Sequence, residues 1–156
     1  MSSLAQNRLI NERKQWRKDH PAGFVAKPSK NKDGSTNLMI WDCEVPGKTG
    51  TIWENGVFHV ELRFPENYPA EAPYCYFVPA IFHPNVFPNG QVCLSILKND
   101  VSQLGWSPSI SIKEILLGIQ HLLATPNWKS PAQSPPAAYE RKVIECIAEY
   151  MKKKST

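Results

Sequence analysis

The 156-residue chain lacks the features that mark membrane, secreted-framework and metal-dependent proteins. No apolar run approaches the roughly 18 residues that cross a bilayer, and no basic-then-apolar segment opens the chain. Its four cysteines form no Cys-x-x-Cys pair, and its four histidines show no metal-ligand spacing with cysteines or carboxylates. We therefore expect no metal, no membrane partner and reduced thiols, with the nucleus and the cytoplasm as the location.

A phosphate-binding loop, internal repeats and low-complexity linkers are also missing. The tripeptide Gly47-Lys48-Thr49 resembles part of such a loop, but the required glycine five positions earlier is absent, and no helix follows. We predict a hairpin turn there and no ATP site. With 42% hydrophobic and 21% charged residues, the chain fits one folded domain over residues 1–156.

Acidic residues are scarce at the start of the chain, although the net charge of the whole is only +4. Through residue 32, eight Lys or Arg face two acidic residues, Glu12 and Asp19, so this fifth of the chain has a charge of +6. Such an imbalance predicts an acidic partner, either a protein surface or a nucleic acid. Beyond Trp16 no aromatic residue is interleaved with the basic run, so we do not expect nucleic acid.

Periodicity and turn residues predict an α+β fold: an N-terminal helix, a four-stranded antiparallel meander, a Cys-bearing loop and C-terminal helices. Ser3 with Gln6, and Ser111 with Glu114, match the capping box that starts a helix. The expected helices span residues 3–18, 111–124 and 137–153, and the expected strands span 23–27, 37–45, 57–64 and 74–78. In the first helix, Leu4, Ala5, Leu9 and Trp16 form the expected apolar stripe.

The most informative stretch is residues 82–97, FHPNVFPNGQVCLSIL. Two prolines and an Asn-Gly pair oppose a helix or a regular central strand, which predicts a stiff loop that presents the Cys93 thiol beside the Asn85 carboxamide. A thiol suits acyl transfer, and an amide N–H can stabilise an oxyanion. Taken alone, the pattern also fits a buried apolar cysteine and an ordinary turn asparagine.

Several motifs together resemble the ubiquitin-conjugating enzyme family. They are Tyr68-Pro69 with Pro73, His83-Pro84-Asn85, Cys93 eight residues after Asn85, Trp106-Ser107-Pro108, and Leu122-Leu123 before Pro126-Asn127. Within that family the chain resembles the SUMO-conjugating branch. That resemblance rests on Glu12-Arg13-Lys14, Trp16-Arg17-Lys18-Asp19-His20-Pro21, Pro46-Gly47-Lys48, Cys93-Leu94-Ser95-Ile96-Leu97 and the segment 115–120.

The resemblance implies that Cys93 receives the C-terminal glycine of SUMO from an activating enzyme and passes it to a substrate lysine. Asn85 would stabilise the oxyanion or order its loop, and His83 would hold that loop. Ser130 stands where the family has an acidic residue that orients the lysine. No cofactor is implied, because ATP is consumed by the upstream activating enzyme.

The resemblance also implies partners and their contact residues. SUMO, the SUMO-activating enzyme, SUMO ligases and substrate proteins are the expected partners. A noncovalent SUMO site would use Arg13, Arg17 and His20, and the activating enzyme would dock on Arg8, Lys14 and Lys18.

The residues that differ from the family's pattern are those expected to recognise the acceptor, the substrate segment that carries the modified lysine. Phe87 and Asn89 would line the substrate groove, where the family has a tyrosine and a small hydroxyl residue. Tyr74 and Tyr76 replace expected lysines, and the loop before the last helix is about eight residues shorter than the family's, by alignment of the motifs. Two alternatives stay open at this point: a ubiquitin carrier of the same fold, and a non-catalytic binding module.

Overall fold

The computed structural model describes residues 3–99 and 105–125. In chain order these form helix α1 (Leu4–Lys18), strands β1 (Val25–Lys30), β2 (Thr36–Pro46), β3 (Val57–Arg63) and β4 (Tyr74–Phe77), the 3-10 helix η1 (Ser95–Leu97) and helix α2 (Ile112–Ala124). The helix predicted over residues 137–153 lies outside the described residues. Within these ranges no helix is long and apolar enough to cross a bilayer, and no group of three potential metal ligands occurs.

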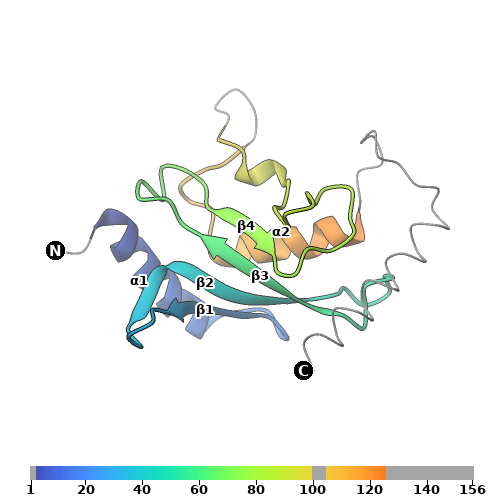
Figure 1. Cartoon of the computed structure of the whole chain (residues 1–156), viewed down its shortest axis with the longest axis horizontal. Coiled ribbons are helices and arrows are strands. Elements are labelled where there is room, and N and C mark those ends of the chain that lie inside the picture. The colour runs from blue at the N-terminus through green and yellow to red at the C-terminus, as the bar shows by residue number, and fades with distance from the viewer. Residues whose placement is uncertain (1–2, 100–104, 126–156) are drawn as a thin grey trace.

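The four strands form one antiparallel sheet in the order β1-β2-β3-β4, which confirms the predicted meander (Figure 1). Cys43 of β2 lies opposite Val60 of β3, and Leu62 of β3 lies opposite Cys75 of β4. Because side chains alternate between the two faces of a strand, this register places all four on one face, where they are fully or almost fully buried. Helix α2 lies behind the sheet and shares this core (Figure 1).

Strand β1 begins two residues later than predicted and runs to Lys30 instead of residue 27. The reason is a turn: Gly23 has a φ of +85°, and the Phe24 N–H donates to the Pro21 carbonyl at 3.3 Å. A strand cannot include a residue in this left-handed conformation. Pro28 has no N–H to donate, and the pairing with β2 shifts between Pro28 and Ser29, which an edge strand tolerates.

Helix α1 starts with the predicted capping box. The Gln6 N–H donates to Ser3 Oγ at 3.1 Å, and the Ser3 N–H donates to Gln6 Oε1 at 3.3 Å. The buried face consists of Ala5, Leu9, Glu12 and Trp16. The prediction that Leu4 belongs to this face is wrong, since Leu4 is 76% exposed: at 3.6 residues per turn it lies about 100° round the helix from Ala5.

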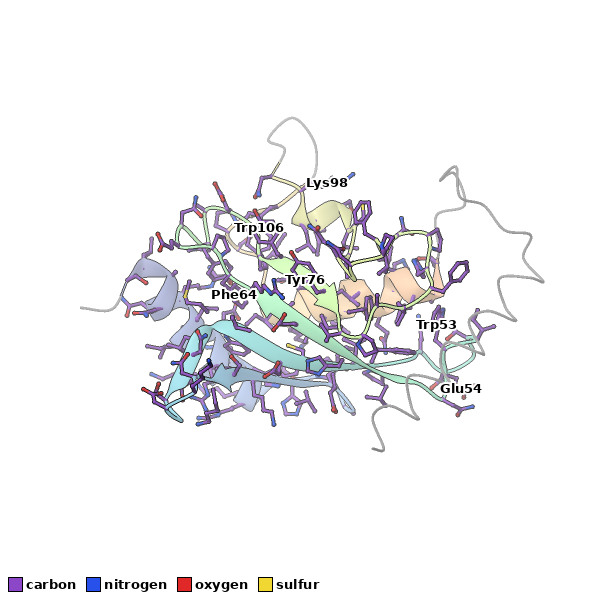
Figure 2. The ribbon with its side chains drawn as sticks, viewed as in Figure 1. Trp53, Glu54, Phe64, Tyr76, Lys98 and Trp106 are labelled. Atoms are coloured by element: carbon purple, nitrogen blue, oxygen red, sulfur yellow. The ribbon has the colours of Figure 1, made fainter. Side chains whose placement is uncertain are left out.

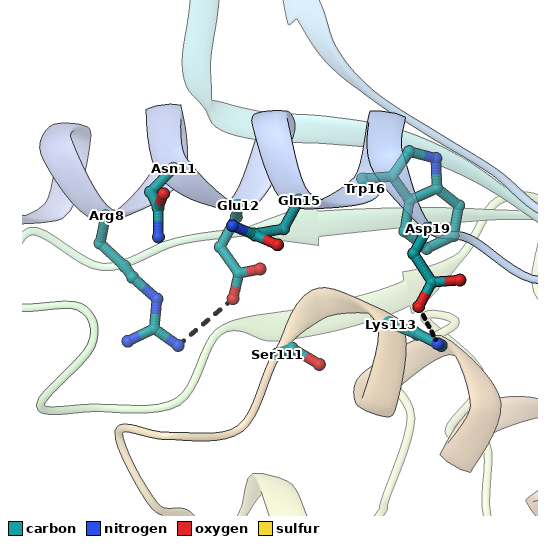
Figure 3. A pocket seen from close by; sticks show the side chains of 8 residues that line it. All are labelled: Arg8, Asn11, Glu12, Gln15, Trp16, Asp19, Ser111 and Lys113. Atoms are coloured by element: carbon teal, nitrogen blue, oxygen red, sulfur yellow. Dashed lines mark hydrogen bonds and ion pairs between the residues drawn. The ribbon is translucent and has the colours of Figure 1, made fainter.

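A charged cluster between α1 and the start of α2 fastens the two helices together (Figure 3). Arg8 donates to the carbonyls of Pro108 at 2.6 Å and Ile110 at 3.2 Å, and its guanidinium pairs with Glu12 at 3.2 Å. Glu12 is only 6% exposed, and this burial raises the pKa of its carboxyl group, although the positive charge of Arg8 opposes the rise. Arg8 therefore compensates a buried carboxylate and satisfies two backbone carbonyls.

Helix α2 begins after Ser111, whose hydroxyl accepts the predicted hydrogen bond from the Glu114 N–H at 3.1 Å. Five of the six predicted core residues of this helix are buried, and Leu122 is half-buried. Gly118 lies under the segment that follows Cys93: a Cβ atom there would approach the Leu94 side chain to 3.3 Å. This close approach lets the chain on the C-terminal side of Cys93 pack directly on α2.

Arg8→Met should lower the free energy of unfolding by about 2 kcal/mol, because it leaves the buried Glu12 carboxylate without a counter-ion and two carbonyls without a donor. Urea unfolding at pH 7 measures this loss. Arg17→Met, which removes an exposed cation from the same helix, should change stability by less than about 0.5 kcal/mol. Equal losses in both variants would contradict the structural role of Arg8.

Candidate active site

Cys93 differs from the other described cysteines in its exposure. Cys43 and Cys75 are buried in the core, and this burial raises the pKa of each thiol well above the usual value for cysteine. Cys93 is only half-buried. Among the described cysteines, Cys93 is therefore the one whose sulfur a reactant could reach, while the other two behave as small apolar core residues.

The backbone around Cys93 forms a narrow hairpin-like loop rather than an irregular one. The Cys93 N–H donates to the Asn85 carbonyl at 2.8 Å, and Val86 forms a bridge with Val92. At the tip, the Phe87 N–H donates to the Gln91 carbonyl at 2.9 Å. The first and last residues of the loop are thus hydrogen-bonded, and Asn85 is held beside the thiol-bearing residue.

The loop also closes the free edge of the sheet. The Val92 N–H donates to the Cys75 carbonyl at 2.9 Å, and the Phe77 N–H donates to the Gly90 carbonyl at 2.8 Å. Gly90 has a φ of +92°, and a Cβ atom there would lie 2.3 Å from the Phe77 carbonyl oxygen. Only glycine allows this approach, so the predicted Asn-Gly turn has a definite role: it docks the loop against β4.

His83 anchors the other end of the loop to helix α2. Its Nδ1 accepts from the Asn85 N–H at 3.0 Å, and its Nε2 lies 2.9 Å from the Leu122 carbonyl. These partners require the neutral ring with its proton on Nε2. Burial lowers the pKa of His83 to about 4, so the ring stays neutral at pH 7. His83 thereby positions the backbone of Asn85 without itself exchanging protons at that pH.

A small hollow of about 170 Å³ opens beside Cys93. Tyr74 and Phe87, which are 51% and 53% exposed, stand at its border. Phe87 thus lies where a predicted groove residue should lie. Asn89 instead supports the tip of the loop, since its Oδ1 accepts from the Gln91 N–H at 3.0 Å, and Asn89 does not line the hollow.

The predicted docking residues of α1 separate into three places. Arg13, Lys14 and Arg17 come together around an apolar hollow of about 270 Å³ formed with the start of β2. His20 stacks on Trp16 at 5.2 Å between ring centroids, and its Nδ1 lies 2.8 Å from the Trp16 carbonyl. Arg8 points to the α2 side. Helix α1 itself lies at the opposite end of the molecule from the tip of the loop that precedes Cys93 (Figure 1).

Three other positions singled out in the sequence have different outcomes. Lys18 is exposed at the end of α1. Ser130, the predicted acceptor-orienting residue, lies outside the described residues. Tyr76, which replaces an expected lysine, is labelled in Figure 2. Its ring packs against the guanidinium of Arg63, whose Cζ lies 4.4 Å from the ring centroid.

Two residues of the site, Asn99 and Lys98, could not be found from sequence, and a third, Trp106, was found only as part of a motif. Asn99 Oδ1 accepts from the Ala72 N–H at 2.9 Å, and Trp106 Nε1 donates to the Pro69 carbonyl at 2.8 Å. Together they fasten the chain after Cys93 to the turn before β4. Lys98, the residue before Asn99, lines the hollow. Trp106 belongs to the motif Trp106-Ser107-Pro108 that supported the family resemblance, but no local pattern indicated Asn99 or Lys98.

The sequence matches the family described as "Ubiquitin-conjugating enzyme" over residues 8–153. It is 51% identical to the SUMO-conjugating enzyme SCE1 of Arabidopsis thaliana, with 91% of this chain and 92% of that protein covered. It is 48% identical to the SUMO-conjugating enzyme UBC9 of Caenorhabditis elegans, with 96% and 93% covered. It is 54% identical to the Sumo-conjugating enzyme ubc9 of Dictyostelium discoideum, with 87% and 84% covered.

Because His83 is buried as a neutral ring, the free energy of unfolding should depend on pH. Its pKa is about 4 in the folded protein and about 6.5 in the unfolded chain, so between these values the unfolded state binds the proton and stability falls as pH decreases. From pH 7 to pH 5 this group should remove about 2 kcal/mol from the free energy of unfolding. Urea titrations at both pH values measure the loss.

His83→Gln should be less stable at pH 7 but should lose less stability on acidification than the unaltered chain. The matched control is His121→Gln, at an exposed position of α2, which should keep the original pH dependence. If all three proteins lost the same free energy between pH 7 and pH 5, His83 would not be the buried neutral ring described above.

Proposed function

The chain belongs to the ubiquitin-conjugating enzyme family, and we propose that it is a SUMO-conjugating enzyme that works through a thioester on Cys93. The supporting observation is that Cys93 is only half-buried and lines a hollow, while its backbone N–H donates to the Asn85 carbonyl. The transferase class and the SUMO assignment agree with the named relatives, which are SUMO-conjugating enzymes from a plant, an animal and an amoeba.

The proposed reaction has two acyl transfers and no redox step. First, the Cys93 sulfur attacks the thioester that joins the SUMO C-terminal glycine to the activating enzyme, and the activating enzyme's thiol leaves. Second, the neutral amine of a substrate lysine attacks the new thioester, so that a C–N bond forms, the C–S bond to Cys93 breaks and the amine loses a proton. Sulfur suits both steps, because a thiolate is a good nucleophile and a good leaving group.

We assign Asn85 to the oxyanion that forms when the lysine attacks. Its backbone N–H donates to His83 and its carbonyl accepts from Cys93, so the residue is held from both sides next to the reacting sulfur. These contacts fix the backbone from which the Asn85 carboxamide extends. A donor on a fixed backbone needs less reorganisation as negative charge develops, which favours electrostatic stabilisation of a transition state. Ser130 remains our proposal for orienting the lysine by a hydrogen bond.

The basic side of α1 is proposed to bind acidic protein surfaces. Arg13 and Arg17, with His20 at the helix end, form the proposed noncovalent SUMO site. Lys14 and Lys18 are proposed for docking of the activating enzyme. Arg8, the third docking candidate, makes its described contacts inside the chain, so its part in docking is the weakest of the three. This exposed docking should weaken as ionic strength rises.

The remaining assignments extend the same proposal. Substrate proteins and the activating enzyme follow from the family, and SUMO ligases are proposed partners. We expect residues 1–156 to act as one catalytic domain that needs no bound cofactor, with ATP consumed by the activating enzyme. The proposed location is the nucleus and the cytoplasm.

A charging assay tests the function. With SUMO, its activating enzyme and ATP, the chain should form an adduct that a reducing agent cleaves. Cys93→Ser should form an adduct that resists reducing agent, because an oxyester is not exchanged by thiols, and Cys75→Ala should still form the cleavable one. The reactions are read on non-reducing and reducing gels.

A parallel reaction with ubiquitin and a ubiquitin-activating enzyme is the control for the alternative carrier. Charging with ubiquitin alone would identify a ubiquitin carrier. No adduct with either modifier, from a folded protein, would reject catalysis and favour a binding module.

Asn85→Ala tests the oxyanion role separately from charging. The variant should still accept SUMO, but transfer to free lysine or a substrate should slow about 100-fold, as expected for loss of one oxyanion donor. The rate comes from single-turnover discharge of the preformed thioester, with the thermal unfolding midpoint as a measure of loop integrity. An unchanged discharge rate would contradict the role. A slowed rate that matches a general loss of stability would assign Asn85 to loop structure only.

A further inference from the structure

The hollow beside Cys93 contains a second nucleophile, the amine of Lys98. Lys98 lines this hollow together with Cys93, Leu94 and Leu97, and none of the other lysines that the structure describes does so. A lysine amine is the group that the proposed reaction modifies, and here one belongs to the wall of the site. The enzyme therefore has an acceptor group of its own next to the residue that carries the thioester.

We propose that Lys98 is an intramolecular acceptor, a modification site to which Cys93 of the same chain transfers SUMO. The proposal rests on the proposed function, because it requires the Cys93 thioester. The neutral amine of Lys98 attacks the carbonyl carbon of the SUMO C-terminal glycine. A C–N bond forms, the C–S bond breaks, the sulfur leaves as a thiolate, and the nitrogen releases one proton to water. Cys93 is then free to accept a second SUMO.

A short turn brings the chain back after Cys93. The Leu97 N–H donates to the Leu94 carbonyl at 3.0 Å, and the Lys98 N–H donates to the Ser95 carbonyl at 3.2 Å. In an extended strand, five residues would separate the Cα atoms of Cys93 and Lys98 by roughly 16 Å, whereas a 3-10 helix such as η1 advances only about 2 Å per residue. The turn thus lets both residues border one hollow of about 170 Å³.

The backbone of Lys98 is also held on its C-terminal side. Its carbonyl accepts from the Trp106 N–H at 2.8 Å, and the carboxamide of Asn99 accepts from the Ala72 N–H at 2.9 Å. The Lys98 side chain is exposed on the surface segment after η1 (Figure 2). A lysine stem is flexible and extends about 6 Å, so the amine moves about a fixed starting point. Such a tether makes attack within one chain faster than attack by a separate molecule.

The other described lysines lie in other parts of the molecule. Those of β1 are three strand spacings, about 14 Å, from β4, on which the Cys93 loop docks. Those of α1 lie at the opposite end of the molecule from the tip of that loop (Figure 1). Lys113 pairs at 2.9 Å with Asp19, the residue after α1. Among the described lysines, position therefore favours Lys98 as the acceptor.

The test follows the fate of the thioester when no substrate is present. The full chain is charged with SUMO, ATP is removed to stop recharging, and the thioester is incubated alone. We expect an adduct that reducing agent does not cleave, and mass spectrometry of the digested product should place it on Lys98. Its first-order rate constant should stay the same over an about tenfold range of enzyme concentration, because the reaction is intramolecular.

Two variants locate the acceptor. Lys98→Arg keeps the positive charge, but a guanidinium is not deprotonated in proteins and so cannot act as the neutral amine. This variant should accept SUMO as a thioester normally and should form the resistant adduct at least about tenfold more slowly. Lys48→Arg, the same replacement at an exposed position of the β2–β3 loop, should form the adduct at the original rate.

A mixing experiment separates transfer within a chain from transfer between chains. Charged Lys98→Arg is mixed with uncharged Cys93→Ala, which retains Lys98 but cannot carry a thioester. We expect no SUMO on the Cys93→Ala chain over the time in which the unaltered enzyme modifies itself.

An adduct on another lysine, an adduct that forms equally fast in Lys98→Arg, or an adduct on Cys93→Ala in the mixture would overturn the proposal. Decay of the thioester by hydrolysis alone, with no resistant adduct, would overturn it as well. Failure of the proposed function would look different, since no thioester would form in the first step.

Discussion

The geometry of the active site depends on one backbone hydrogen bond, from the Cys93 N–H to the Asn85 carbonyl at 2.8 Å. It closes the loop from Asn85 to Cys93 and holds the backbone of Asn85 next to that of Cys93. Two further contacts keep the closed loop in place: His83 ties its start to α2, and Gly90 lets its tip touch β4. A loop held at its start, its tip and its end loses little conformational freedom when a thioester forms, so more of the binding energy remains available for the reaction.

Helix α1 illustrates how one short element can serve both the core and a partner. Its inner face buries Leu9 and Trp16 together with Glu12, whose charge Arg8 compensates. Its outer side gathers Arg13, Lys14 and Arg17 at the start of β2. The two sets of charges are adjacent in sequence, since Arg13 directly follows Glu12, but they face different surroundings. A charge count over the helix therefore overstates the positive charge that is free to bind a partner.

Sequence reasoning recovered the order of the elements, the meander and both helix starts, because these depend on local patterns: period-two alternation in β3, period 3.6 in α2, and capping residues at Ser3 and Ser111. It failed where a neighbour distant in sequence decides. Leu4 was assigned to the core because it is apolar. The resemblance implied that Arg8 docks the activating enzyme, and it gave no indication of the contacts that Arg8 makes inside the chain. The actual surroundings of both residues depend on how α1 packs, and in the case of Arg8 on carbonyls about 100 residues away.

By itself, the sequence determined the chemical elements of the site: a cysteine, an asparagine and a histidine at fixed spacing in a proline-stiffened segment, and a family resemblance that implies acyl transfer. The tertiary structure decided which thiol is accessible and which charges are free. Cys43 and Cys75 have the same side chain as Cys93, yet the sheet and α2 bury them and leave Cys93 half-exposed. Lys98 acquires its meaning only from the hollow that it shares with Cys93. Burial and charge compensation depend on neighbours in space, and for these residues the neighbours come from different elements of the chain.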